Sequence, residues 1–125
     1  MKNPSLKRVA QTGLAVTLFA GALAVTPAAA YAANNSKSCD VAFTSCTTGS
    51  IPAEQPGHWV NWDVQTGGCG ADWKMVDAGN GVTVGSGHVG SSSARNGWIG
   101  GLYGSYYLKV YNTCWDANGI ISNFD

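Results

Sequence analysis

The sequence predicts an all-β protein, an antiparallel β-sandwich or small barrel of about six to seven short strands. Two observations support this prediction. Residues 33–125 contain short segments rich in β-branched and aromatic residues, separated by Gly- and Asn-containing turns at intervals of about eight to twelve residues. In the same region, no stretch of about ten residues places its apolar side chains at helical spacing.

Residues 1–32 have the order of a secretory signal peptide. Three positive residues lie among the first eight, an apolar run spans Leu14 to Val25, and the segment ends in Ala30-Tyr31-Ala32. The alternative is an uncleaved membrane anchor, but the helix of such a run would extend only about 18 Å, less than a hydrocarbon core of about 30 Å. We therefore expect export by the general secretory route, cleavage after Ala32, and a single secreted β domain at 33–125.

The secreted part of the chain is mildly acidic. The whole sequence balances seven Lys and Arg with seven Asp and Glu, but three of the positive residues belong to the signal peptide. Residues 33–125 therefore carry a formal net charge of −3. This charge argues against nucleic acid as a partner, and against attachment to a membrane through basic residues after cleavage.

Four cysteines, all in the secreted part, indicate two disulfides, as an even number does in a small secreted domain. They are Cys39, Cys46, Cys69 and Cys114. Three pairings are possible. We favour Cys39–Cys46 with Cys69–Cys114, because the first two are close in sequence and Thr44-Ser45 between them allows a turn. Zinc is the competing explanation, but zinc sites usually contain closely spaced cysteine pairs, which this chain lacks. We expect no metal and no cofactor.

The expected strands follow from two-residue alternation and from the turns between segments. They are 41–43, 58–66, 71–77, 82–89, 98–103, 106–115 and 120–123. Residues 33–37 are expected to form a loose polar arm, and 49–57 and 90–97 to form loops; the second loop ends in the turn sequence Asn96-Gly97.

Two of the strands have well-defined faces. In 58–66, Val60, Trp62 and Val64 share one face, and Asn61, Asp63 and Gln65 share the other. In 71–77, Trp73 and Met75 share a face. In 106–115, the face of Tyr106, Leu108, Val110 and Cys114 is assigned to the core.

Five aromatic residues are the candidate binding residues: Trp59, Trp98, Tyr107, Tyr111 and Trp115. Tyr107, Tyr111 and Trp115 recur at every fourth position on the face of their strand that is turned away from the core. An exposed row of this kind can stack on sugar rings or pack on an apolar surface of a partner. The alternative is that these rings pack on neighbouring strands or under a loop.

Signals for catalysis are weak. The chain has no G-x-S-x-G motif, and no carboxylates have a spacing that predicts an acid/base pair. The segment Asp116-Ala117-Asn118-Gly119 begins like a calcium loop but lacks its later ligands, so we expect a hairpin turn. A small hydrolase using Asp and His is a minor alternative.

The segment Val82–Ser91 (VTVGSGHVGS) resembles the corresponding stretch of tendamistat-type α-amylase inhibitors. These are small secreted actinobacterial β-sandwiches with two disulfides, and the resemblance implies the same fold and compartment for this chain. The family inhibits through a Trp-Arg-Tyr segment in a turn. The nearest local match here is Trp73-Lys74-Met75.

These observations favour a secreted, non-enzymatic extracellular binding protein, with another protein such as a secreted hydrolase as its target. The alternative is a module that binds carbohydrate or cell-wall glycan through exposed Trp and Tyr. The expected partner is therefore an extracellular protein or polysaccharide. The sequence leaves the oligomeric state open.

Overall fold

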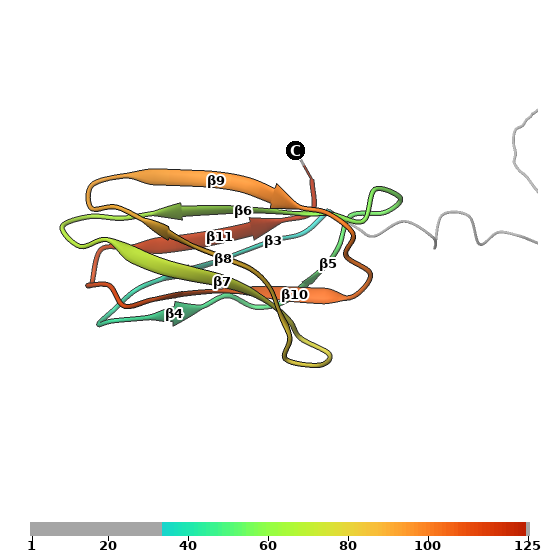
Figure 1. Ribbon diagram of the computed structural model, residues 1–125, viewed down its shortest axis with the longest axis horizontal. Helices are drawn as coiled ribbons and strands as arrows, with labels where there is room; N and C mark the ends of the chain where they lie inside the picture. The colour runs from blue at the N-terminus through green and yellow to red at the C-terminus, as the bar shows by residue number, and fades with distance from the viewer. Residues whose placement is uncertain (1–33, 125) are drawn as a thin grey trace, which may run out of the picture. The chain divides into compact units, whose positions relative to one another are not determined.

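Two antiparallel sheets pack face to face in the computed structural model, which describes residues 34–124 (Figure 1). The strands are β3 (Ser36–Asp40), β4 (Cys46–Thr47), β5 (Ile51–Pro52), β6 (Val60–Gln65), β7 (Ala71–Asp77), β8 (Thr83–Val89), β9 (Ala94–Ile99), β10 (Ser105–Tyr111) and β11 (Asn118–Ser122). The predicted all-β fold is confirmed. The predicted signal peptide lies outside the described residues.

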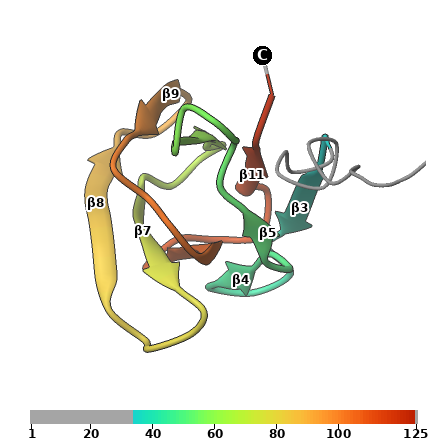
Figure 2. The same ribbon diagram turned by 90° about the vertical axis from the view of Figure 1, so that its right-hand side faces the viewer.

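The four-stranded sheet has the order β3-β11-β6-β9. The five-stranded sheet has the order β4-β10-β7-β8, and β5 also pairs with β10. The edge strands β3 and β8 lie on opposite sides in Figure 2. Between β4 and β5, Thr48 continues the pairing with β10, because its N–H donates to Leu108 O (2.9 Å) and its Oγ1 accepts from Leu108 N (3.0 Å).

The core lies between the two sheets and draws on six of the nine described strands, β5, β6, β7, β8, β10 and β11, and on their connections. Its buried members are Val41, Ile51, Ala53, Val60, Val64, Ala71, Trp73, Met75, Val89, Leu102, Tyr106, Leu108, Val110, Ala117 and Ile121. The inward faces predicted for β6 and β7 are confirmed, as is that of β10 for Tyr106, Leu108 and Val110. Cys114, which was assigned to the same face, lies beyond the end of β10 and is half-buried. Tyr106 also has a polar contact at its tip, since its Oη accepts from the N–H groups of Tyr103 (3.1 Å) and Gly104 (3.0 Å).

Two tryptophans join the sheets through a direct ring contact. The rings of Trp62 on β6 and Trp73 on β7 have centroids 4.0 Å apart. Each indole lies over a glycine of the neighbouring edge strand. A side chain at Gly97 on β9 would come within 3.2 Å of the Trp62 ring, and one at Gly87 on β8 within 2.8 Å of Trp73 Nε1. The glycines therefore leave the space that the two indoles fill.

Both disulfides lie at one end of the strands, and both have the predicted pairing. Cys39–Cys46 joins β3 of one sheet to β4 of the other. Cys69–Cys114 joins the β6–β7 connection to the β10–β11 connection. We call this end of the molecule the disulfide end; in Figure 1 it is on the left. The two bonds fit an oxidising extracellular compartment.

Several strand bounds differ from the predicted ones. Nine strands are present in the described part of the chain, rather than six or seven, because the short β4 and β5 gave no periodic signal. The strand predicted at 41–43 is wrong. Polar residues 36–40 form β3 by pairing with β11, while Phe43 lies in the following bend with 83% of its surface exposed. Strand β9 spans 94–99 rather than 98–103, and thus includes Asn96-Gly97.

Across residues 34–124, we find no helix with the length and apolarity required to cross a membrane.

Gly119 on β11 faces the five-stranded sheet at a point where the sheets approach closely. A methyl group there would lie 2.7 Å from Val110 Cγ2 and 2.9 Å from Leu108 Cδ2. We predict that Gly119→Ala lowers the free energy of unfolding by about 1–3 kcal/mol, the usual cost of overpacking a core. Urea unfolding measures this change.

The matched control is Gly68→Ala in the β6–β7 connection, where an added methyl meets no heavy atom within 4 Å. This variant should change the free energy of unfolding by less than about 1 kcal/mol. Equal losses in the two variants would contradict the packing described for β11.

Candidate binding site

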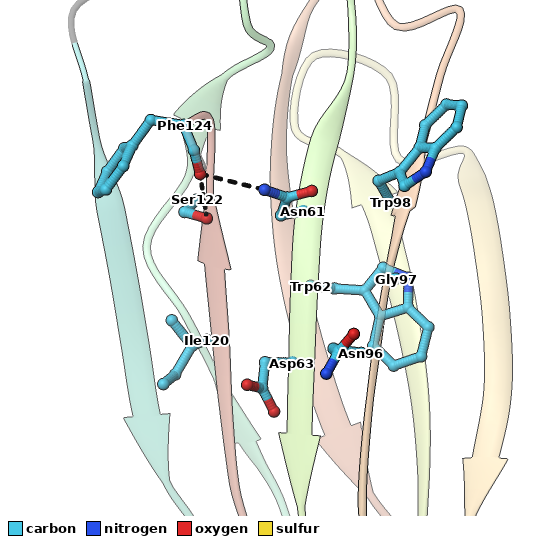
Figure 3. Close-up of a pocket in the computed structure, with 9 residues that line it drawn as sticks. All are labelled: Asn61, Trp62, Asp63, Asn96, Gly97, Trp98, Ile120, Ser122 and Phe124. Atoms are coloured by element: carbon cyan, nitrogen blue, oxygen red, sulfur yellow. Dashed lines mark hydrogen bonds between the residues drawn. The ribbon is translucent and has the colours of Figure 1, made fainter.

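A groove of about 350 Å³ lies on the outer face of the four-stranded sheet (Figure 3). Its lining residues come from β6, β9, β11 and the C-terminal segment: Asn61, Trp62, Asp63, Asn96, Gly97, Trp98, Ile120, Ser122 and Phe124. Most of these side chains are polar or aromatic, and all of the lining residues except Phe124 stand on strands. A site built on sheet residues keeps its geometry without a ligand.

Cross-strand register arranges the floor of the groove in two rows. One row is Ile120–Asp63–Asn96, and the other is Ser122–Asn61–Trp98. Neighbouring strands are about 4.8 Å apart, so each row extends about 10 Å across the sheet. The two rows form an open, shallow surface rather than an enclosed cavity.

The core determines which side chains reach this surface. Because alternate residues of a strand point to opposite faces, the inward Val60 and Val64 place Asn61 and Asp63 outward. On β9, the same alternation follows from the inward position of Gly97. This residue faces inward beneath Trp62, so its two neighbours, Asn96 and Trp98, face the groove.

Trp98 forms one side of the groove with 68% of its surface exposed. Its indole extends along the strand over Gly100, where an added side chain would lie 2.9 Å from Trp98 Cζ3. The missing side chain at Gly100 therefore provides space for the ring. A large aromatic face is thus presented to solvent beside polar groups.

Phe124 forms the opposite side of the groove, and Asn61 lies between it and Trp98 in Figure 3. The carbonyl oxygen of Phe124 accepts hydrogen bonds from Asn61 Nδ2 (3.1 Å) and Ser122 Oγ (3.3 Å). These bonds fix the C-terminal segment against β6 and β11. Figure 3 shows the amide oxygen of Asn61 on the side of Trp98.

Of the five predicted binding residues, the groove contains Trp98 alone. Trp59 is half-buried beside Gly57, where an added side chain would meet its Nε1 at 2.6 Å. Tyr107 and Tyr111 are half-buried on the outer face of the other sheet. The prediction that Trp115 continues their row is wrong, because β10 ends at Tyr111.

The structural reason for this ending is the next residue, Asn112, which has a φ of 51° and turns the chain out of the extended conformation. Trp115 consequently lies in the β10–β11 connection at the disulfide end, with 72% of its surface exposed.

The groove also contains residues that were not predicted as binding residues. Asn61 and Asp63 were assigned to the outer face of their strand by alternation, but polar residues on an outer face are common. Asn96 was assigned to a turn. Phe124 reaches the groove through hydrogen bonds to its backbone, for which the sequence carries no signal.

A second polar cluster lies on the outer face of the five-stranded sheet. Asp72 Oδ1 accepts a hydrogen bond from His88 Nδ1 (2.8 Å), and Asp72 Oδ2 accepts one from Asn112 Nδ2 (2.9 Å). Hydrogen bonding from Asn112, and then from His88, holds the pKa of Asp72 below its ordinary value of 3.8. The Asn112 bond also ties the turn after β10 to β7.

This Asp–His pair bears on the hydrolase alternative. A nucleophile would have to hydrogen-bond to the second ring nitrogen of His88. Among residues 34–124, no hydroxyl group does so, and the pair stands on an open sheet face with 65% of the His88 side chain exposed. The cluster therefore has the geometry of a surface contact that fixes a turn.

No family model and no curated protein matches the chain. Among solved structures, a crystal structure of PirA is similar at 11% sequence identity and a TM-score of 0.47, over 70% of this chain and 90% of that chain. A similarity at this level carries no argument about function.

The segment nearest to the inhibitory turn of tendamistat-type proteins lies in β7, an inner strand of its sheet. Its Trp73 is buried in the core. Met75 of the same segment is also buried, so only Lys74 of these three residues reaches the outer face of the sheet.

We predict that Asp72→Asn changes the pH dependence of thermal stability. Because the folded pKa of Asp72 is lowered, its carboxylate contributes stability above its ordinary pKa, and this contribution is lost as the pH falls through the folded value. The wild-type protein should therefore have the higher Tm at neutral pH, and the two Tm values should converge in strong acid.

Circular dichroism melts over the acidic and neutral range measure this effect. Asn112→Ala removes the larger cause of the lowered pKa of Asp72. This variant should therefore show part of the loss of Tm at neutral pH that Asp72→Asn shows. Wild-type and Asp72→Asn curves that stay parallel at every pH would contradict the account.

Proposed function

We propose that this protein is a secreted, non-enzymatic binding protein, and that it binds neutral carbohydrate in the groove of the four-stranded sheet. The observation that carries the proposal is the exposed Trp98 ring beside the polar floor of Asn61, Asp63 and Asn96. The signal-peptide pattern and the two disulfides support secretion.

The groove matches the two kinds of surface on a sugar. The C–H face of a sugar ring is apolar and can stack on Trp98, whose indole is large and rigid. The hydroxyl groups need both donors and acceptors, which the Asn61 and Asn96 amides provide, while Asp63 provides acceptors. Because strands hold these groups in place, little conformational entropy is lost on binding.

The number of carboxylates that line the groove favours binding over hydrolysis. Glycoside hydrolysis normally uses two carboxyl groups on either side of the scissile bond, about 5–10 Å apart. Among the residues that line the groove, Asp63 is the one carboxylate. The groove therefore offers recognition without an acid/base pair.

We predict that Trp98→Ala weakens binding to carbohydrate by about tenfold or more, equivalent to about 1.4 kcal/mol of lost stacking. The measurement is depletion of the purified protein from solution by insoluble chitin, cellulose and starch. Trp115→Ala is the matched control, because Trp115 is similarly exposed but lies at the disulfide end.

The proposal fails if none of the three polymers retains the protein. It also fails if Trp98→Ala binds as tightly as the wild type, or if Trp115→Ala causes the same loss. Thermal melts of both variants should match the wild type, since neither side chain belongs to the core.

A second candidate function is protein binding through the disulfide end. The motivating observation is that Phe43 and Trp115, two highly exposed aromatic residues, both stand on connections closed by disulfides. A backbone hydrogen bond from Thr113 N to Thr44 O (3.3 Å) holds these connections together. Exposed aromatic residues on a rigid frame are frequent anchors of protein interfaces.

Inhibition assays with secreted amylases and proteases test this candidate. Trp115→Ala should abolish any inhibition, and Trp98→Ala should leave it intact. Absence of inhibition across the panel would count against this candidate and leave the carbohydrate proposal unaffected.

A further inference from the structure

Two lysines meet on the outer face of the five-stranded sheet. Lys74 on β7 and Lys109 on β10 are directly opposite each other in the antiparallel register. Their Nζ atoms lie 5.7 Å and 5.9 Å from the centroid of the same ring, that of Tyr111. Both ammonium groups therefore lie within cation–π range of the same ring, on side chains that start from directly opposite positions.

Such a pair has an electrostatic cost, because like charges directly opposite each other destabilise a sheet. It also stands out in a domain that is otherwise acidic, since residues 34–124 contain four cationic and six acidic side chains. Half of the cationic side chains thus belong to this one pair. Within the same residues, the structure contains one ion pair, His88–Asp72, so neither lysine is in direct ion-pair contact with a carboxylate.

The surroundings of the pair suit an extended, anionic ligand. Asp72 is the nearest acidic neighbour in the register, opposite Tyr111, and both of its oxygens already accept hydrogen bonds from His88 and Asn112. Tyr107 shares the outer face of β10 with Tyr111, about 13 Å away at 3.3 Å per residue. The lysine pair therefore lies between two half-buried rings on an open sheet surface.

We propose that this face, defined by Lys74, Lys109, Tyr107 and Tyr111, binds an acidic polysaccharide through its carboxylate groups. A carboxylate between the two ammonium groups would remove their repulsion, and the tyrosines would contact the sugar rings on either side. The site is separate from the neutral-carbohydrate groove, which lies on the other sheet, and does not depend on it.

The test uses polygalacturonate as the probe and its fully methyl-esterified form as the uncharged counterpart. Affinity electrophoresis of the purified protein should show retardation by polygalacturonate and none by the ester. Retardation should weaken when salt is raised from about 0.02 M to about 0.5 M, because exposed charges are then screened.

Lys74→Gln and Lys109→Gln should each weaken the apparent affinity at least about fivefold, and the double variant should show no retardation. Lys37→Gln is the matched control, because it removes the same charge from β3 of the other sheet. Tyr111→Phe should preserve binding and Tyr111→Leu should weaken it, since the ring positions both lysines. Trp98→Ala should bind polygalacturonate normally, which separates this site from the groove.

The inference is overturned by any of these results: no retardation by polygalacturonate, equal retardation by the ester, an equal loss in Lys37→Gln, or normal binding by the double variant. Competition by inorganic phosphate at equal charge concentration would indicate a site for small anions instead, and would also overturn it.

Discussion

The contact between Trp62 and Trp73 is the constraint on which the rest of the structure depends. A domain of this size has little apolar volume, and two indoles supply a large share of it on the side where the sheets end in β8 and β9. The contact requires a glycine opposite each indole, Gly97 on β9 and Gly87 on β8. Core packing therefore determines which residues of β8 and β9 face inward and which face outward.

The candidate groove is a consequence of this packing. With Gly97 turned inward under Trp62, its neighbours Asn96 and Trp98 must face outward, beside Asn61 and Asp63 of β6. The two disulfides join the sheets at the other end of the strands, so the groove is held in place by strand pairing and by the tryptophan contact. The protein thus presents one aromatic and polar face on the four-stranded sheet and one cationic face on the five-stranded sheet.

The sequence allowed the fold class, the disulfide pairing and the faces of β6 and β7 to be predicted, because each produces a local pattern. Strand β9 was misplaced, because Asn96-Gly97 is typical of a turn. The glycine is needed instead to leave space for the ring of Trp62, which is distant in sequence. The prediction that Trp115 shares a strand face with Tyr107 and Tyr111 was wrong, because Asn112, with its left-handed backbone conformation, ends β10. Of the residues that line the proposed binding groove, Trp98 was among the predicted candidates, and its polar neighbours were visible only once β6 and β9 were paired.

The most direct test of the central claim is an NMR titration that follows the five tryptophan indole N–H signals, assigned from single Trp→Phe variants. The probes are the soluble tetrasaccharides of chitin, cellulose and starch. One of these tetrasaccharides should shift the Trp98 signal in a saturable way, with smaller changes at Trp62, which also lines the groove, and none at Trp115. A saturable shift of Trp115 with Trp98 unchanged, or no shift with any of the three, would contradict it.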